Sequence, residues 1–188
     1  SFNAIASAGN IAVSGDTIEG DTLSLTALAG SIDASSSFIG QSVDIDAANN
    51  LTLTGDVTAA TSALAGAGGE LTLTAGNGPL VVNGDLDGTT ILLTSTAGEI
   101  DATSNMSATT ISFDAGTDLT LAGDITAVDT LTLDATDALD YSGNATSQGD
   151  VILTGQSITM NSGSLNGAAV EATSPGAVVL AGEINTAG

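Results

Sequence analysis

Apolar residues recur along this chain in a fixed order about every 20 residues. Two segments show the order most plainly: residues 50–59 read NLTLTGDVTA, and residues 118–127 read DLTLAGDITA. The first apolar residue of each repeat is taken as its anchor. The anchors are Ile11, Ile32, Leu51, Leu80, Ile100, Leu119, Leu139, Ile158 and Val178, with steps of 21, 19, 29, 20, 19, 20, 19 and 20. Such self-similarity at a fixed period indicates an internal repeat.

Each repeat contains three apolar groups separated by turn-forming residues. The first is an alternating pair at the anchor, such as Leu119/Leu121, and the third is a similar pair, such as Leu131/Leu133. The second is one residue six or seven positions after the anchor, predicted as Ile18, Ile39, Val57, Leu86, Met106, Ile125, Ala145, Leu165 and Ile184. Alternation with a period of two predicts short strands with one buried face, and the intervening Gly, Asn, Asp and Ser residues predict turns.

A repeat of three short strands is too small to bury its own apolar face, whereas stacked repeats bury a shared one. Equivalent strands of successive repeats then pair in parallel, about 4.8 Å apart. The sequence therefore predicts an all-β fold over residues 1–188: one parallel, three-sided β-helix (β-solenoid) of about nine coils of ~20 residues. We expect it to be right-handed, as crossover connections between parallel strands are.

The 29-residue step predicts a loop insertion in the third coil. Leu51, Leu53 and Val57 arrive on schedule, but the third pair, Leu71/Leu73, arrives about nine residues late. The extra residues therefore lie within residues 58–70. Solenoids often place functional segments in such loops. The inserted residues are small and uncharged, which favours a flexible decoration instead.

The two ends of the chain fall at complementary points of a coil. If Gly188 were joined to Ser1, Ile184 and Phe2 would lie six positions apart, which matches the spacing from Ile125 to Leu131. We therefore expect the chain to be a unit of a longer tandem fibre, or separate copies to stack head to tail. In either case the Ser1–Ala4 end meets the Ile184–Gly188 end. Open parallel edges favour such head-to-tail assembly.

The charge balance excludes many functions. The chain has 22 Asp and Glu residues and no Lys, Arg, His or Cys, so its formal net charge is −22. Without cationic side chains we expect no nucleic-acid partner and no binding to anionic membranes. Without His or Cys there is no imidazole acid–base pair, no thiol nucleophile, no disulfide and no zinc site of the usual kind. No apolar run approaches the ~18 residues of a membrane span.

The motifs at residues 50–59 and 118–127 resemble the repeats of filamentous haemagglutinin-like large exoproteins. Bacteria export these right-handed β-helices, often by two-partner secretion, as adhesins or surface fibres, and autotransporter passengers have similar repeats. The resemblance covers essentially the whole chain but lies in a degenerate repeat. It implies an extracellular or cell-surface location and supplies no catalytic residue. The basic residues common in that family are absent from this sequence.

Two outward columns of acids accompany the repeat. In the register above, Asp56 and Asp85 follow consecutive anchors by five residues, and Asp114 and Asp134 are neighbours in a column after the third strand. Like charges directly opposite are destabilising. A bound divalent cation, raised carboxylate pKa values or outward splay into solvent would relieve the repulsion. The four residues are thus candidates for weak calcium sites. The calcium-binding nonapeptide GGxGxD is absent, and a solvated acidic face is favoured over specific calcium sites.

The leading hypothesis is a non-enzymatic, extracellular structural rod without a resident cofactor: a unit of a bacterial surface filament, sheath or adhesin stalk. One alternative is a carbohydrate-active β-helix enzyme that uses two carboxylates. Candidate pairs are Asp44/Asp46 and Asp85/Asp87, although any acidic solenoid would contain such pairs by chance. A second alternative is an ice-binding solenoid, suggested by Thr-x-Thr pairs, namely Thr52/Thr54 and Thr72/Thr74. Acids interrupt the Thr column, and no aromatic platform for sugars is evident.

Overall fold

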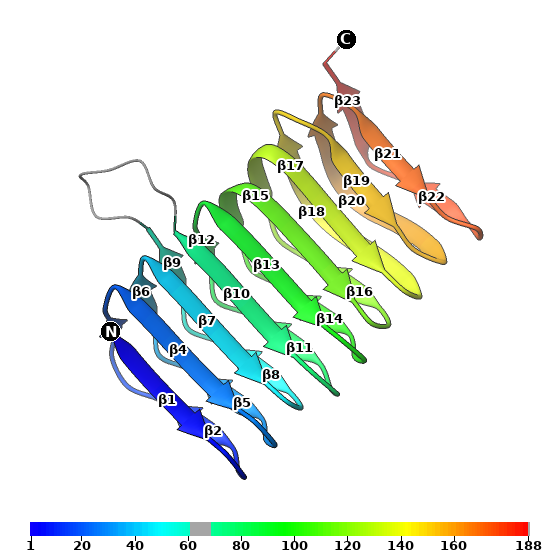
Figure 1. Cartoon of the computed structure of the whole chain (residues 1–188). Coiled ribbons are helices and arrows are strands. Elements are labelled where there is room, and N and C mark those ends of the chain that lie inside the picture. The colour runs from blue at the N-terminus through cyan, green and yellow to red at the C-terminus, as the bar shows by residue number, and fades with distance from the viewer. Residues whose placement is uncertain (61–68, 188) are drawn as a thin grey trace.

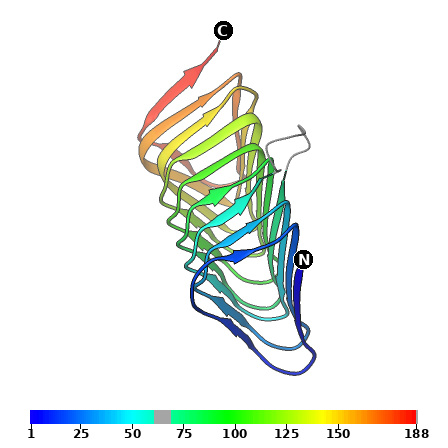
Figure 2. The same ribbon diagram turned by 90° about the vertical axis from the view of Figure 1, so that its left-hand side faces the viewer.

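The computed structural model describes residues 1–60 and 69–187. Across these residues the chain is all-β, with 23 strands wound into one parallel β-solenoid of about 9 turns of roughly 20 residues each (Figure 1). The strands nearest the viewer run down to the right while successive coils advance up to the right, which is the sense of a right-handed solenoid. The two ends of the chain lie at opposite ends of the stack (Figure 2).

Each coil contains a first, a second and a third strand position. The first position is occupied by β2 (Ile11–Val13), β5 (Ile32–Ala34), β8 (Leu51–Leu53), β11 (Leu80–Val82), β14 (Ile100–Ala102), β16 (Leu119–Leu121) and β22 (Val178–Leu180). The second is occupied by β3 (Ile18–Glu19), β6 (Phe38–Gly40), β9 (Val57–Ala59), β12 (Leu86–Asp87) and β23 (Glu183–Thr186). The third is occupied by β1 (Phe2–Ala6), β4 (Thr22–Ala27), β7 (Ser42–Ala47), β10 (Glu70–Ala75), β13 (Thr90–Ser95), β19 (Val151–Thr154) and β21 (Val170–Thr173).

Four longer strands turn a corner of the coil without interruption. β15 (Met106–Ala115) and β17 (Ile125–Ala135) combine the second and third positions. β18 (Ala138–Ser147) and β20 (Ser157–Gly167) combine the first and second positions. Every coil therefore has the same three strand positions. The coils that contain these long strands differ only in that one strand continues through a corner.

The predicted register is confirmed at all nine anchors. Leu80, for example, pairs in parallel with Leu51 in the preceding coil and with Ile100 in the following one. The same pairing continues to Ile11 at one end and to Val178 at the other. Since the anchors of successive coils pair without slippage, their apolar side chains form a continuous column along the solenoid axis.

These columns make a dry apolar core. The side chains of Leu51, Leu80 and Ile100 are 0% exposed, and the alternate residues of the same strands face outward. Burial of this apolar surface is the main favourable contribution to folding. Each coil depends on the coils above and below it to cover its inward residues, as expected for a solenoid.

One inward residue differs from the prediction. Phe38, and not Ile39, occupies the second position of its coil: Phe38 pairs with Ile18 and Val57 and is 1% exposed, whereas Ile39 is 44% exposed. In a strand a shift of one residue moves a side chain to the opposite face. The spacing of six residues from Ile32 to Phe38 equals that from Leu51 to Val57, so the six-residue corner is the rule here.

Two of the corners between the first and second strand positions contain an additional residue, and each includes a glycine with positive φ. Seven residues separate the anchor from the second inward residue in the first and eighth coils, where Gly15 has a φ of 131° and Gly163 a φ of 92°. Residues with a Cβ rarely adopt this conformation, whereas glycine adopts it readily. The glycines allow a longer corner to return the chain to the common register.

The predicted insertion within residues 58–70 lies largely outside the described residues, which omit 61–68. On its two sides β9 ends at Ala59 and β10 begins at Glu70. β10 pairs with β7 of the preceding coil, with Leu71 opposite Val43. The stacking of coils therefore continues in register across the insertion.

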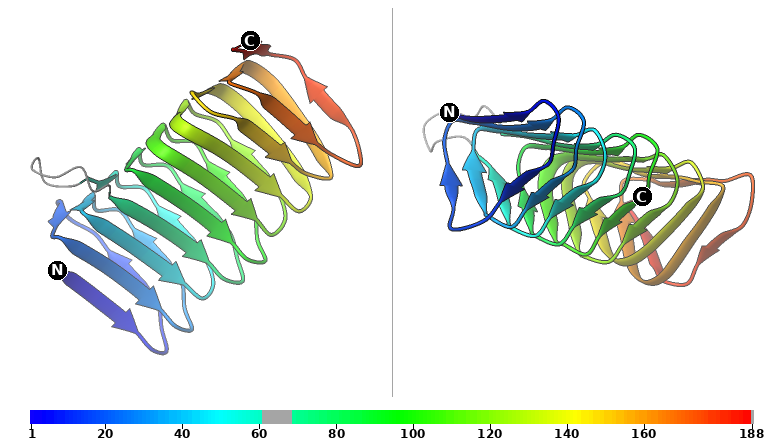
Figure 3. Two further views of the ribbon diagram at one scale, coloured as in Figure 1. Left: turned by 45° about the horizontal axis from the view of Figure 1, so that its top comes forward. Right: turned by 90° about the horizontal axis from the view of Figure 1, so that it is seen from below.

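The end coils of the described solenoid are each covered on one side. At one end of the solenoid, β1–β3 pair with β4–β6. At the other end, β21–β23 pair with β19 and β20. Within the described residues, no strand pairs with the outer edges of these end strands (Figure 3). Inward residues at these ends are consequently exposed: Phe2 by 37%, Val178 by 42% and Ile184 by 41%. Both ends thus present a cross-section of the apolar core.

Candidate functional site: the side-chain ladder, the groove and the end faces

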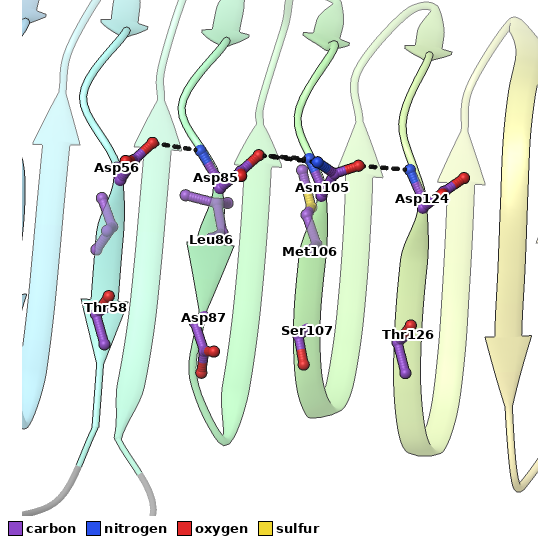
Figure 4. Close-up of a pocket in the computed structure, with 11 residues that line it drawn as sticks. Asp56, Thr58, Asp85, Leu86, Asp87, Asn105, Met106, Ser107, Asp124 and Thr126 are labelled. Atoms are coloured by element: carbon purple, nitrogen blue, oxygen red, sulfur yellow. Dashed lines mark hydrogen bonds between the residues drawn. The ribbon is translucent and has the colours of Figure 1, made fainter.

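A ladder of side-chain hydrogen bonds runs along the corner before the second strand position. The backbone N–H of Asp85 donates to Oδ1 of Asp56 at 2.9 Å, and the N–H of Asn105 donates to Oδ1 of Asp85 at 2.9 Å (Figure 4). Asn105 Oδ1 in turn accepts from the N–H of Asp124 at 3.1 Å. Each side-chain oxygen therefore binds the backbone of the next coil.

The ladder continues toward the C-terminal end. Asp124 Oδ1 accepts from both the backbone N–H (3.1 Å) and Nδ2 (2.9 Å) of Asn144. Asn144 Oδ1 then accepts from the Ser164 hydroxyl at 3.1 Å. Five positions after the anchor Ile158 the sequence has Gly163, but the longer corner of this coil places Ser164 in the column instead, opposite Asn144. Similarly, Asp16 in the first coil lies one residue before the matching position.

The ladder explains how Asp56 and Asp85 tolerate their closeness. Both are exposed, and each carboxylate accepts a backbone N–H from the coil that follows it. Hydrogen bonds to a charged acceptor are stronger than neutral ones. The repeat period places the two residues in one column but does not specify these bonds. The signal for them was the recurrence of Asp or Asn directly before the second strand position.

An open groove of about 380 Å³ lies beside the ladder (Figure 4). A second outward column, two residues further along each strand, forms its other side: Asp87 lies between Thr58 and Ser107 of the adjacent coils, and Thr126 follows Ser107. The lining therefore offers carboxylate, hydroxyl and amide oxygens in rows one coil apart, and no cationic side chain. Such a surface suits neutral hydroxylated or cationic ligands and repels anions.

The second predicted column also forms. Asp114 lies directly opposite Asp134 on the third face, and both side chains are exposed. On the same face, Asp44 has a raised pKa, chiefly because of partial burial and further because of the nearby charges of Asp46 and Glu70.

The four candidate calcium ligands form two pairs on different faces of the coil. Asp56 and Asp85 lie at the edge of the groove, whereas Asp114 and Asp134 lie on the third face. Among residues 1–60 and 69–187, no group of three or more His, Cys, Asp or Glu is arranged to hold a metal ion. Calcium takes 6–8 oxygen ligands. Two carboxylates alone fall short of that number, and weak calcium binding stays a prediction.

The structure also shows where residues of the two alternative functions lie, the Asp pairs of an enzyme and a Thr-x-Thr pair of an ice-binding face. Asp85 and Asp87 both line the groove, while Asp44 and Asp46 point outward from β7. Thr72 and Thr74 point outward from β10, where their neighbours in the preceding coil are Asp44 and Asp46. The Thr-x-Thr pair thus adjoins carboxylates and does not continue as a uniform Thr face.

The fold assigns the chain to the parallel β-solenoids. No family model, no curated protein and no solved structure matches the chain. The resemblance to filamentous haemagglutinin-like exoproteins therefore stays a prediction that rests on the repeat motifs. Among the described residues no helix has the length and apolar character that a membrane span requires.

Proposed function

We propose that this chain is a structural, non-enzymatic unit of an extracellular rod, such as a bacterial surface filament, sheath or adhesin stalk. Its units join end to end through their terminal coils, either as tandem repeats of one polypeptide or as separate copies. The observation that carries this proposal is the exposure of core residues at both ends, with Phe2 at one end and Val178 and Ile184 at the other.

The chemistry of the two ends supports joining. An uncovered strand edge presents unpaired N–H and C=O groups, which are a template for another strand. Within the described residues, the outer strands β1–β3 and β21–β23 expose the apolar side chains of Phe2, Val178 and Ile184. Two different surfaces that bind head to tail produce an open assembly, which grows as a filament.

The negative charge on the sides of the solenoid is consistent with a rod that does not associate laterally with other rods. The 22 acids have no cationic side chain to offset them. They lie on the outside, while the core columns are apolar. Strong net charge keeps proteins soluble and opposes lateral association. Because most of this charge lies along the flanks, association along the axis is favoured over association side by side.

Electron microscopy and light scattering across a concentration series test this proposal. We expect narrow filaments that lengthen with concentration. The variant Ile184→Lys, which places an ammonium group in one end face, should shorten them to single units, whereas Asp140→Asn on the flank should not. Particles of unit length at every concentration would contradict joining between copies. Antibody labelling and protease treatment of intact source cells test the location, and antigen found solely inside the cell would contradict it.

The groove supports a second candidate, a carbohydrate-active enzyme. Asp85 and Asp87 both line it and lie two residues apart on the same outward face. Glycoside hydrolysis uses two carboxyl groups about 5–9.5 Å apart on either side of the bond that breaks. An assay on neutral polysaccharides tests this candidate. Turnover that is abolished in both Asp85→Asn and Asp87→Asn would support it, and no turnover by the native chain would exclude it for those substrates.

A further inference from the structure

The two ends of the solenoid present the same three strand positions. At one end the outermost strands are β1 in the third position, β2 in the first and β3 in the second. At the other end they are β21 in the third position, β22 in the first and β23 in the second. The N-terminal face of one copy can therefore continue the C-terminal face of another as its next coil, with all strands parallel.

The register within the solenoid fixes which residues would meet. Third-position strands pair at their first inward residue, as Leu131 does with Val151 and Val151 with Val170. Extending each column by one step places Phe2 on Val170, Ile11 on Val178 and Ile18 on Ile184. All six are inward residues of their coils, and a second copy would remove the exposed ones from water.

We propose that copies of this chain join in this one register, because it places every outward carboxylate of the three paired strands opposite a neutral hydrogen-bonding partner. This inference rests on the proposed function and adds the partner and the alignment. Three cross-junction pairs follow from the register: Glu171 with Asn3, Glu183 with Thr17, and Glu19 with Asn185.

The three pairs repeat contacts that exist inside the solenoid. Glu183 lies at the ladder position, opposite Ser164, so its carboxylate would accept from Thr17 as Asp56 accepts from Asp85. Asn185 already donates from Nδ2 to Asn166 Oδ1 at 2.9 Å. An amide nitrogen has two hydrogens. The second hydrogen is available to the carboxylate of Glu19.

The charge of the chain makes this alignment selective. A shift by two residues along the second-position strands would place Glu19 opposite Glu183, and like charges directly opposite are destabilising. A shift by one residue would in addition turn the inward side chains outward. The inferred register avoids both costs at once, and the ends of the chain are therefore matched in polarity as well as in shape.

A charge-placement experiment on the whole chain tests the register. Asn3→Asp places a carboxylate opposite Glu171, and like charges directly opposite cost up to about 1 kcal/mol, which corresponds to about fivefold in the association constant. We expect light scattering to show this weaker association and electron microscopy to show shorter filaments. The double variant Asn3→Asp/Glu171→Gln should restore association. Asn10→Asp adds the same charge to the same end away from any inferred acidic partner, and should leave association unchanged.

A second pair repeats the test at another strand. Asn185→Asp should weaken association, and Glu19→Gln in the same chain should restore it. Equal effects of Asn3→Asp and Asn10→Asp, or the failure of both rescues, would overturn the register while leaving end-to-end joining intact. Absence of any association in the native chain would overturn the proposed joining itself. Circular dichroism of each variant confirms that the coil is unchanged.

Discussion

The backbone N–H of Asp85 donates a 2.9 Å hydrogen bond to the carboxylate of Asp56, which belongs to the preceding coil. Two acids that the repeat brings side by side are thus joined by a bond between coils. Asp85 makes the same contact with Asn105, accepting its N–H at 2.9 Å. The ladder converts a column of acids, which would otherwise only repel, into a connection along the solenoid axis.

The ladder predicts different outcomes for two substitutions at one position. Asp85→Asn keeps an acceptor oxygen and removes one charge, so we expect stability equal to or above that of the native chain. Asp85→Ala removes the acceptor for Asn105 and should lower the free energy of unfolding by about 1 kcal/mol. Urea denaturation measures both. Asp87→Ala, outward on the same strand, controls for loss of charge, and equal effects of Asp85→Asn and Asp85→Ala would contradict the ladder.

The hydrogen bond between Asp85 and Asp56 also predicts how calcium affects thermal stability. If Asp56 and Asp85 are satisfied by backbone donors, calcium should add little, and thermal midpoints with and without calcium at fixed ionic strength should agree. If calcium binds specifically, the midpoint should rise, because a ligand that binds the folded state stabilises it. In that case the rise should disappear in Asp85→Asn or in Asp114→Asn, which identifies the pair involved. A rise that magnesium reproduces equally would indicate general screening.

The repeat period was sufficient to predict the columns of the core. Equivalent anchors such as Leu51 and Leu80 pair as the spacing requires, even across the insertion. The error at Phe38 and Ile39 has a local cause: adjacent apolar residues offer two equally hydrophobic choices, and the length of the corner decides between them. The recurrence of Asp or Asn before the second strand position marks the ladder column, but the bonds themselves depend on side-chain direction at a corner, which periodicity does not specify.

The position of a core residue along the solenoid axis should determine how much stability is lost when its side chain is truncated to alanine. Leu80 is 0% exposed between Leu51 and Ile100, so Leu80→Ala should lower the free energy of unfolding by about 2–5 kcal/mol. Val178 is 42% exposed at the end of the same column. Val178→Ala should therefore cost well under half as much in dilute solution. Guanidinium denaturation compares the two, and similar losses would show that the end coil is already covered.

The two glycines with positive φ form a matched pair. A Cβ on Gly15 would meet no atom within 4 Å, so Gly15→Ala should cost only the backbone strain, about 1–3 kcal/mol. A Cβ on Gly163 would overlap the carbonyl oxygen of Gly143 in the preceding coil. Gly163→Ala should therefore be clearly the more destabilising of the two in thermal denaturation. Equal losses would mean that the corner relaxes away from its neighbour.

Asp44 should make stability depend on pH in a definite direction. Partial burial, together with Asp46 and Glu70, raises its pKa in the folded chain above the ordinary 3.8. The folded state then holds the proton more tightly than the unfolded state, so this group lowers stability as the pH rises from 3.8 through the raised pKa. Asp44→Asn removes the ionisation.

We therefore expect Asp44→Asn to be more stable than the native chain at pH 7, with the difference shrinking as the pH falls toward 3.8. Urea denaturation at several pH values, at constant ionic strength, measures this. Asp140→Asn, an exposed acid on another strand, removes the same formal charge and controls for the general repulsion of the chain. If the two variants gain equally at every pH, the effect belongs to net charge and not to the surroundings of Asp44.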